Sequence, residues 1–468
     1  MSEAQGDAWR WPLEGSCDQA RIARIEHITS PYESSPPPIC YPGTPLDREM
    51  IAMVPELMRK QLNGIGFHTP NGIGEGGFDS TQKMESAAVH MVAGMLGGTP
   101  QTVDGYFCGG GTEANLEGLY IGRQWLRCFA DPQKKGIAVL CTPLAHYSIF
   151  FKGTNILGLT NQFRWTECPK CHRAHKLPKN ENTEHLRLVG VDINGKMHLP
   201  SLEQIFLKAY EEGYRQFLLV ATAGTCLMGS IDPISEIGQW MKRTKREYHV
   251  EFYFHVDASF GGFTIPFASE GKEHIGFDVP EVMSVTVDAD KMGHLPYPAG
   301  VFLCRKGLQE HVGLEVAYIR GHGDYTISGS RSAIAPVLAW DYYQRLGVDG
   351  QTRYVNACLE ARDHLLRKIL ERFERNNHVY PLSCSPFVNF LPLVIDLVDG
   401  SVPEDQIEHG PLAPYHLRSD GIPTERMDPL SCPMIAYKLC IMPHTFGFLD
   451  RFVDDLETVV RAAGKFGS

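Results

Sequence analysis

The sequence predicts an α/β fold with a large, mostly parallel sheet, followed by a smaller C-terminal α/β domain. Between about residues 70 and 310, apolar runs rich in Val, Ile, Leu and Phe alternate with helical stretches. These runs show little polar alternation, which is typical of strands buried on both faces. A chain of 468 residues, 43% of them hydrophobic and 21% charged, is long enough to bury such a core.

The expected elements follow from local patterns. The first 60 residues should be mostly irregular, because the Ser-Ser-Pro-Pro-Pro cluster at 34–38 cannot lie inside a helix or a central strand. Apolar residues at helical spacing predict a helix over 80–97. The apolar runs predict strands at 136–142, 216–221, 251–256, 282–287 and 300–304. Helices are expected between them at 113–128, 201–213 and 234–244, and later elements at 350–375 (helix), 388–395 (strand) and 449–464 (helix).

These elements suggest three parts. We expect an N-terminal arm over 1–66, a large domain over 67–344 with an insert at 163–187, and a small domain over 345–468. The net charge of −11 makes nucleic acid an unexpected partner. No apolar run approaches the roughly 20 residues that span a bilayer, and the first residues do not resemble a secretory signal. Thirteen scattered cysteines suit a reducing compartment, so a cytoplasmic location is expected.

A glycine-rich string, Cys-Gly-Gly-Gly-Thr-Glu-Ala-Asn at 108–115, opens one predicted helix. Glycines let the backbone approach a ligand closely, and the amides at a helix N-terminus favour an anion. The string matches neither a Walker A loop nor the G-x-G-x-x-G fingerprint. Taken alone, it is more typical of a plain glycine turn in which Thr112 caps the helix.

Two charged residues follow neighbouring predicted strands. Asp257 ends the string Phe-His-Val-Asp, and Lys291 stands in the string Asp-Ala-Asp-Lys. Alone, Asp257 also fits a helix N-cap and Lys291 a salt-bridged loop lysine. Ligands of open α/β sheets bind at the carboxyl ends of the strands. An anion cradle, an acid and a lysine at that edge together meet the needs of pyridoxal phosphate for its phosphate, its ring nitrogen and its aldehyde.

The chain resembles the pyridoxal-phosphate-dependent group II amino acid decarboxylases, which have the type I (aspartate aminotransferase) fold. The resemblance runs from about Phe67 to Ala335. It rests on five strings in order: GGGTEAN (109–115), AHYSIFFKGTNILGL (145–159), ATAGTCLMGSIDPI (221–234), FHVDASFGGF (254–263) and DADKMGHLPYPAG (288–300). It implies decarboxylation of an L-amino acid to the amine and carbon dioxide.

The resemblance also implies roles for single residues. Lys291 would hold the cofactor covalently, Asp257 would pair with its ring nitrogen, and His146 would stack on the ring face where substrate arrives. Alone, His146 would read as an ordinary histidine at a strand end. The segment around Ser330 looks like the element with which a partner subunit closes the phosphate site, which implies a homodimer. The other expected cofactor-binding residues are Gly110, Gly111, Thr112, Cys226, Ser259 and Asp288.

Two residues depart from the family's pattern. Asp290 stands where the family usually has histidine, and an acid near a phosphate is repelled unless it is paired or points away. Cys226 stands where the family commonly has threonine, and a thiol is a weaker donor. These departures leave the substrate more open than the cofactor.

The insert carries a second possible site. Cys168 and Cys171 have the spacing of half a zinc knuckle, with His175 close by. A second C-x₂-C is missing, although His172 or His185 could complete a site. The insert is therefore either a structural zinc site or, as the missing half favours, a loop with free thiols.

Two further residues are candidates through the resemblance. Tyr318 lies 27 residues after Lys291, where related decarboxylases have a mobile loop whose tyrosine protonates the product carbon; an ordinary surface tyrosine fits equally well. His68 lies where relatives place pocket residues, and a loop histidine without a ligand is the preferred interpretation.

Alternative functions stay open. The nearest is another reaction of the same cofactor: a carbon–carbon lyase, an aminotransferase or a decarboxylating oxidase. A non-catalytic relative that serves as a binding partner is the alternative from another class. An aromatic substrate is favoured by Phe67, Tyr147 and Tyr318, and an acidic one remains possible.

Overall fold

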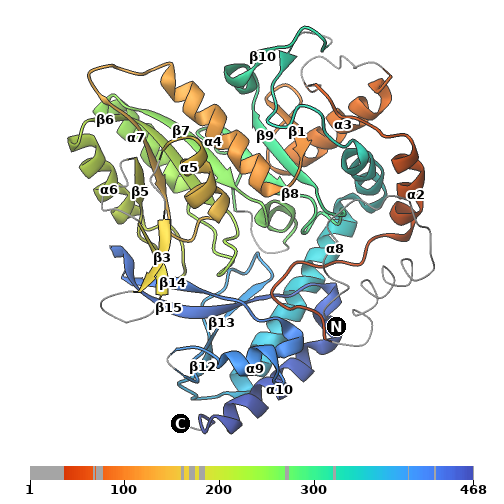
Figure 1. Cartoon of the computed structure of the whole chain (residues 1–468), viewed down its shortest axis with the longest axis vertical. Helices are drawn as coiled ribbons and strands as arrows, with labels where there is room; N and C mark the ends of the chain where they lie inside the picture. Colours follow the sequence, from red (N-terminus) through yellow and green to blue (C-terminus); the bar gives the residue numbers. More distant parts are fainter. Residues whose placement is uncertain are drawn as a thin grey trace, which may run out of the picture.

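A seven-stranded sheet forms the centre of the larger part of the molecule (Figure 1). The computed structural model describes residues 36–66, 69, 77–159, 163–167, 174–178, 185–268, 273–319, 323–398, 400–425 and 428–466. The strand order is β1-β9-β8-β7-β6-β2-β5. The strands are β1 (Val103–Cys108), β2 (Lys135–Cys141), β5 (Leu186–Leu188), β6 (Tyr214–Thr222), β7 (Glu251–Asp257), β8 (Ser284–Asp288) and β9 (Gly300–Arg305).

Five neighbouring strands of this sheet, from β8 to β5, run parallel, whereas β9 is antiparallel to both β8 and β1. Asp257, at the end of β7, pairs with Thr222 of β6 and with Thr286 of β8. The carboxyl ends of these three strands therefore meet at one edge, which is where ligands of such sheets bind.

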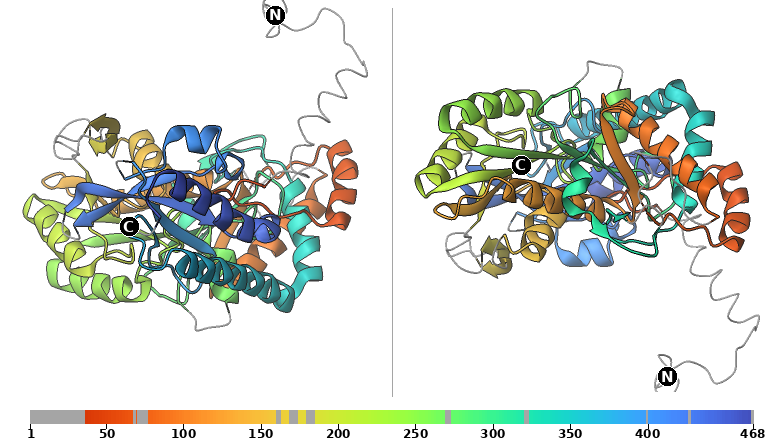
Figure 2. Two further views of the ribbon diagram at one scale, coloured as in Figure 1. Left: turned by 90° about the horizontal axis from the view of Figure 1, so that it is seen from below. Right: turned by 90° about the horizontal axis from the view of Figure 1, so that it is seen from above.

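Helices cover both faces of the sheet, which explains the continuous apolar runs. Side chains on α3 (Asp79–Met95), α6 (Leu199–Glu211) and α7 (Ile234–Tyr248) share one core with Phe252, Phe254 and Val256 of β7. The opposite face packs on α4 (Gly111–Arg127), in a core that includes Tyr253. Figure 2 shows α6 and α7 on one side of the sheet and α4 on the other.

The smaller part is a four-stranded antiparallel sheet of order β12-β13-β15-β14. Its strands are β12 (Val379–Pro381), β13 (Phe390–Ile395), β14 (Ser419–Glu425) and β15 (Asp428–Cys440). The helix α10 (Leu449–Ala462) and the end of α8 (Ile334–Arg372) pack on it. Figure 1 shows α8 running from the larger part to the smaller one, and its path breaks at Gly347, where φ is 63°. The expected domain limit at 344/345 falls beside this break and stays a prediction.

The remaining elements are short or peripheral. They are α2 (Arg48–Arg59), α5 (Thr154–Ile156), α9 (Glu404–Glu408), β3 (Phe163–Glu167), β4 (Ala174–Pro178), β10 (Leu314–Glu315) and β11 (Gly323–Asp324). In the insert, β3 and β4 pair as an antiparallel hairpin. No helix in the described part of the chain is long and apolar enough to cross a membrane.

The predicted fold class is confirmed, and so are the five strands predicted in the large sheet. The expectation of a mostly irregular start is wrong for α2, which begins after the N-cap Asp47, whose side chain accepts a hydrogen bond from the Met50 amide at 3.0 Å. The arm also packs within its own chain, because Ile39 and Cys40 lie buried in the core of the small domain.

Candidate active site

Lys291 and Asp288 form an ion pair just beyond the end of β8. The Lys291 Nζ lies 2.6 Å from Asp288 Oδ2, and both side chains are largely buried. Burial alone would lower the pKa of Lys291, but the Asp288 carboxylate, with Cys226 and Asp257 nearby, raises it overall. Burial raises the pKa of Asp288. The lysine is therefore charged and faces an acceptor for its proton.

Asp257 is the last residue of β7 and is buried. Its Oδ1 accepts hydrogen bonds from Ser259 Oγ at 2.5 Å and from the Ser259 amide at 3.0 Å. Burial alone would raise the pKa of Asp257, but His146, Ser259 and Lys291 lower it overall. This carboxyl group is therefore ionised at neutral pH and can hold a positive charge on a ligand.

The glycine cradle lies against Asp288 and Ser259. Gly110, with φ of 112°, is the N-cap of α4, so the alternative in which Thr112 caps the helix is wrong. A Cβ added at Gly111 would lie 2.6 Å from Asp288 Oδ2 and 2.8 Å from Ser259 Oγ. The N-terminus of α4 and the ends of β7 and β8 thus meet, and only glycine permits this approach.

His146 lies between β2 and α5 and is mostly buried. Its Nδ1 lies 2.7 Å from Ser148 Oγ and 3.3 Å from the Ser148 amide, and its ring lies 4.1 Å from that of Tyr147. Burial lowers the pKa of His146 to about 4, against the opposing charge of Asp257. The imidazole is therefore neutral at physiological pH.

The two residues that depart from the family's pattern are both near Lys291. Cys226 is exposed, and its negative form would raise the pKa of Lys291. Asp290 accepts a hydrogen bond at Oδ2 from the Ala299 amide at 2.7 Å. Burial, with Asp288 nearby, raises the pKa of Asp290 to about 7. The expected repulsion is reduced, because this acid is held by a backbone donor and is partly protonated at neutral pH.

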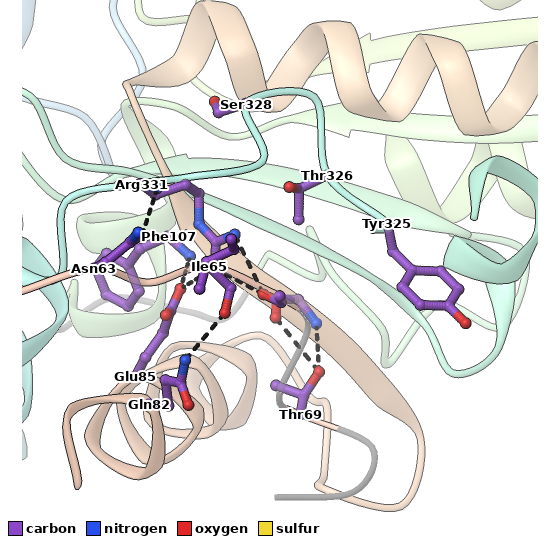
Figure 3. Close-up of polar contacts among 12 residues, drawn as sticks. Asn63, Ile65, Thr69, Gln82, Glu85, Phe107, Tyr325, Thr326, Ser328 and Arg331 are labelled. Carbon is purple, nitrogen blue, oxygen red and sulfur yellow. Dashed lines mark hydrogen bonds and ion pairs between the residues drawn. The ribbon is translucent and has the colours of Figure 1, made fainter. Parts of the chain in front are cut away.

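The segment around Ser330 is anchored by a buried ion pair (Figure 3). Arg331 Nη2 lies 3.0 Å from Glu85 Oε1, and Nη1 donates to the Gly66 carbonyl at 3.3 Å. Ser330 Oγ accepts from Asn63 Nδ2 at 3.4 Å. Ser328, just before this segment, donates to Glu113 in the first turn of α4. Within one chain the segment therefore already reaches the helix that carries the cradle.

The structure does not bring every candidate to this site. Tyr318 is 81% exposed on the surface. His68, Cys168 and Cys171 lie outside the described residues, as does the side chain of His175. Among the residues that the structure describes, no group of side chains could hold a metal ion.

Sequence reasoning missed Asn115, Ser148 and His255, three buried polar residues that support the site. Asn115 donates to Asp257 Oδ2 and to Ser148 Oγ, each at 3.0 Å, and it contacts His255 Nε2 at 2.9 Å. The sequence spacing of Asn115 and His255 could have indicated that they lie near the site. Asn115 lies one helical turn after Gly111, and His255 lies two strand positions before Asp257, on the same face.

These residues fit pyridoxal phosphate. Gly111, which has no side chain, opens a 17-residue helix whose N-terminal amides favour a phosphate, and it lets this helix end come close to Asp288 and Ser259. An ionised Asp257 suits a protonated ring nitrogen, and Lys291 supplies an amine for the aldehyde. The donor set matches the three polar ends of the cofactor.

Comparison with known proteins agrees with this reading. Residues 38–380 match the model of the pyridoxal-dependent decarboxylase conserved domain. The L-tyrosine/L-aspartate decarboxylase of Methanocaldococcus jannaschii is 26% identical over 397 residues, 82% of this chain and 84% of that protein. The tryptophan decarboxylase of Clostridium sporogenes is 28% identical over 296 residues, 63% of this chain and 63% of that protein.

Solved structures share the fold at low sequence identity. Glutamate decarboxylase of Lactobacillus brevis superposes with a TM-score of 0.73 at 14% identity, covering 99% of this chain and 97% of that one. L-Methionine decarboxylase of Streptomyces superposes with a TM-score of 0.73 at 16% identity, covering 99% of this chain and 98% of that one.

Proposed function

Because this chain belongs to the pyridoxal-dependent decarboxylase family and is an amino acid decarboxylase, we propose that Lys291 binds pyridoxal phosphate covalently and that Asp257 and His146 complete its catalytic site. The observation that carries this proposal is the meeting of Lys291, Asp288 and Asp257 with the N-terminus of α4 at Gly111.

Each residue has a separate task. The amides of Gly111 and Thr112, with the helix dipole behind them, bind the phosphate. The carboxylate of Asp257 holds the ring nitrogen protonated, and Ser259 keeps that carboxylate in place. When bound, the cofactor supplies an electron-withdrawing ring that stabilises the charge left on the α-carbon after carbon dioxide departs. Asp288 takes up or returns the proton of Lys291 as the amine exchanges.

Cys226, Ser330 and Tyr318 complete the proposed site. Cys226 lies close enough to Lys291 to raise its pKa, which supports a place for Cys226 beside the cofactor's ring. Ser330 precedes Arg331, whose ion pair with Glu85 holds this segment near α4. Of the two candidates, Tyr318 returns the proton to the α-carbon, because His146 is neutral at physiological pH and serves as a hydrogen-bond donor. Exposed in the structure, Tyr318 would have to move with its loop to do so.

The substrate is an L-amino acid, and we favour an aromatic one. The exposed ring of Tyr147, beside that of His146, offers an apolar surface near the site. An acidic substrate is the second candidate, favoured by Lys438 of β15. Burial lowers the pKa of His146 most, and the charges of Lys291 and Lys438 lower it further, so a cation from the small domain lies near the site.

The test is carbon dioxide release from single L-amino acids with added pyridoxal phosphate, with Lys291→Ala as the control. Release that the control lacks supports the proposal and identifies the substrate. Lys438→Met should reduce release from glutamate or aspartate and spare release from tyrosine or tryptophan. Equal release by wild type and Lys291→Ala would contradict the proposal.

The assembly is proposed to be a homodimer. The support is the resemblance of the segment at 329–331 to the element with which a partner subunit closes the phosphate site, together with exposed apolar side chains that include Ile51, Met58 and Ile327. Sedimentation at several concentrations tests this, and a monomer of 52.3 kDa throughout would contradict it. A cytoplasmic location is also proposed, supported by the nine cysteines whose side chains the structure describes, all of which are free.

A further inference from the structure

A chain of buried polar side chains runs behind Asp257 and ends at His146. It begins on β7, crosses to β8, returns to β7, enters α4 and finishes beside η2 (Ser148–Gly153). Its members, in order, are Tyr253, Ser284, His255, Asn115, Ser148 and His146, with a branch from Asn115 to Asp257.

The two-residue period of a β-strand explains why several of these polar side chains lie on the same face of β7. Tyr253, His255 and Asp257 are alternate residues of β7, so all three face α4. On α4, Gly118 makes room for the imidazole, because a Cβ there would lie 2.4 Å from His255 Cε1. Asn115, three residues earlier on the same side of the helix, then reaches both His255 and Asp257.

The charge of Asp257 fixes the direction of every hydrogen bond. A carboxylate only accepts, so Asn115 must present its Nδ2 to Asp257 Oδ2, which lies 3.0 Å away. The amide oxygen of Asn115 then faces His255 Nε2 at 2.9 Å, and this nitrogen must donate. His255 Nδ1 is left as the acceptor for Ser284 Oγ at 2.8 Å, and Ser284 in turn accepts from Tyr253 Oη at 2.9 Å.

The hydrogen bonds from Asn115 to Ser148 and from Ser148 to His146 determine which ring nitrogen of His146 carries the hydrogen. The second hydrogen of Asn115 Nδ2 is donated to Ser148 Oγ at 3.0 Å, so the hydroxyl hydrogen of Ser148 is free to point at His146 Nδ1, 2.7 Å away. The Ser148 amide also points at that nitrogen, at 3.3 Å. Two donors therefore converge on Nδ1, which cannot carry a hydrogen of its own in this arrangement.

We propose that Asn115 and Ser148 are positioning residues that hold His146 as its neutral Nε2–H tautomer, so that His146 offers the reaction a hydrogen-bond donor and not a base. The same amide orients Asp257 toward the cofactor's ring nitrogen. The assignment to the reaction rests on the proposed function, whereas the tautomer does not.

The electrostatics agree with this arrangement. Burial lowers the pKa of both His146 and His255 to about 4, so both rings are neutral at pH 7 and each has a single ring hydrogen to place. Thr286 Oγ1 also approaches His255 Nε2, at 3.4 Å, and as an acceptor it is compatible with the Nε2–H form.

The tautomer can be read directly by nitrogen NMR of histidine labelled with ¹⁵N in its ring, at pH 7, on the full chain with pyridoxal phosphate bound. The protein has 19 histidines, so His146→Gln identifies the signals of His146. We expect a protonated Nε2 and an unprotonated, hydrogen-bonded Nδ1. A protonated Nδ1 in the wild type would overturn the proposal.

Variants separate positioning from general stability. Ser148→Ala should shift the Nδ1 signal and give a mixture of tautomers. The matched control is Ser201→Ala on α6. It removes a buried hydroxyl that accepts a hydrogen bond from the Gly190 amide at 2.8 Å, and it should leave the signals of His146 unchanged. An unchanged His146 in Ser148→Ala would also overturn the proposal.

Asn115→Leu tests the branch to Asp257. Without the Asn115 donor, the dissociation constant of pyridoxal phosphate should rise on the order of tenfold, and that of Ser201→Ala should not change. Equal affinity for pyridoxal phosphate in Asn115→Leu and wild type would show that the hydrogen bond from Asn115 to Asp257 does not support cofactor binding. If Asn115→Leu fails to fold, Ser148→Ala alone decides the proposal. The NMR experiment reports the tautomer of His146 even in a protein without decarboxylase activity. Failure of the tautomer proposal can therefore be distinguished from failure of the proposed function.

Discussion

The guanidinium of Arg331 lies 3.0 Å from the carboxylate of Glu85, and both side chains are almost completely buried. The pair joins the segment before α8 to α3, and Glu85 Oε1 also accepts from the Phe107 amide of β1 at 3.0 Å. As Figure 3 shows, Asn63 and Ile65 lie beside this pair: Asn63 Oδ1 accepts from the Arg331 amide, and the Ile65 carbonyl accepts from Gln82 Nε2 of α3. This pair therefore fixes the surroundings of the glycine cradle.

Removal of one partner of this pair should be costly. Glu85→Ala leaves the Arg331 charge buried without its partner, and we expect a loss of about 3–5 kcal/mol in the free energy of unfolding. The control is Glu56→Ala, which breaks exposed pairs with Arg59 and Lys60 and should cost less than about 1 kcal/mol. Denaturant unfolding measures both, and equal losses would show that the buried pair has no special role.

Glu117 predicts a pH dependence of stability. Burial raises the pKa of this α4 carboxyl group from 4.5 to about 8, although the Tyr106 hydroxyl partly opposes the shift. The folded chain therefore keeps a proton that the unfolded chain releases. The resulting stability is complete below about pH 4.5 and is lost as the pH rises toward about 8.

Glu117→Gln should remove this dependence. Relative to the wild type, the variant should gain about 3 kcal/mol in unfolding free energy between pH 4.5 and pH 7, at about 1.4 kcal/mol per pH unit. Unfolding curves at several pH values measure the gain. Parallel pH profiles for the two proteins would contradict the raised pKa of Glu117.

Two helical glycines should respond in opposite ways to alanine. Gly118→Ala puts a Cβ 2.4 Å from the His255 ring and should destabilise the protein by about 1–3 kcal/mol. Gly94→Ala on α3 meets no heavy atom within 4 Å and should stabilise it by up to about 1 kcal/mol. Thermal unfolding of both variants measures the difference, and a stable Gly118→Ala would mean that His255 is not seated against α4.

Asp290 should make cofactor binding depend on pH. Burial, with Asp288 nearby, raises the pKa of Asp290 to about 7, so this group gains a negative charge as the pH rises through neutrality. Affinity for pyridoxal phosphate should fall over that range in the wild type, because the phosphate is an anion. Asp290→Asn should bind with less pH dependence. Identical pH profiles in titrations of the two proteins would place Asp290 out of reach of the phosphate.

The parts of the fold that could be predicted are those that a single local pattern specifies. Strands β6 and β7 lie between helix layers, so their apolar runs are continuous and easily seen. Strand β1 was missed because Asp104 and Gly105 interrupt its apolar run. The structure shows why both are there: Asp104 Oδ2 accepts from the Gly307 amide at 3.0 Å, and a Cβ at Gly105 would lie 2.3 Å from the Phe302 carbonyl oxygen.

The site was predictable only where one motif carries one role. Lys291, Asp257 and Gly111 each stand in such a motif, and the structure brings them together. Asn115 and His255 were missed, although both lie inside quoted strings, because their importance depends on a contact between residues 140 positions apart. That contact depends on how α4 crosses β7, which no local pattern specifies.

The most direct test of the central claim is to locate the cofactor on the chain. Borohydride reduction makes the bond between a lysine and pyridoxal phosphate permanent, and digestion with mass spectrometry then identifies the labelled peptide. The account predicts one label per chain, at Lys291, and none in Lys291→Ala. A label at another lysine such as Lys152 or Lys438, or no label in protein saturated with the cofactor, would contradict it.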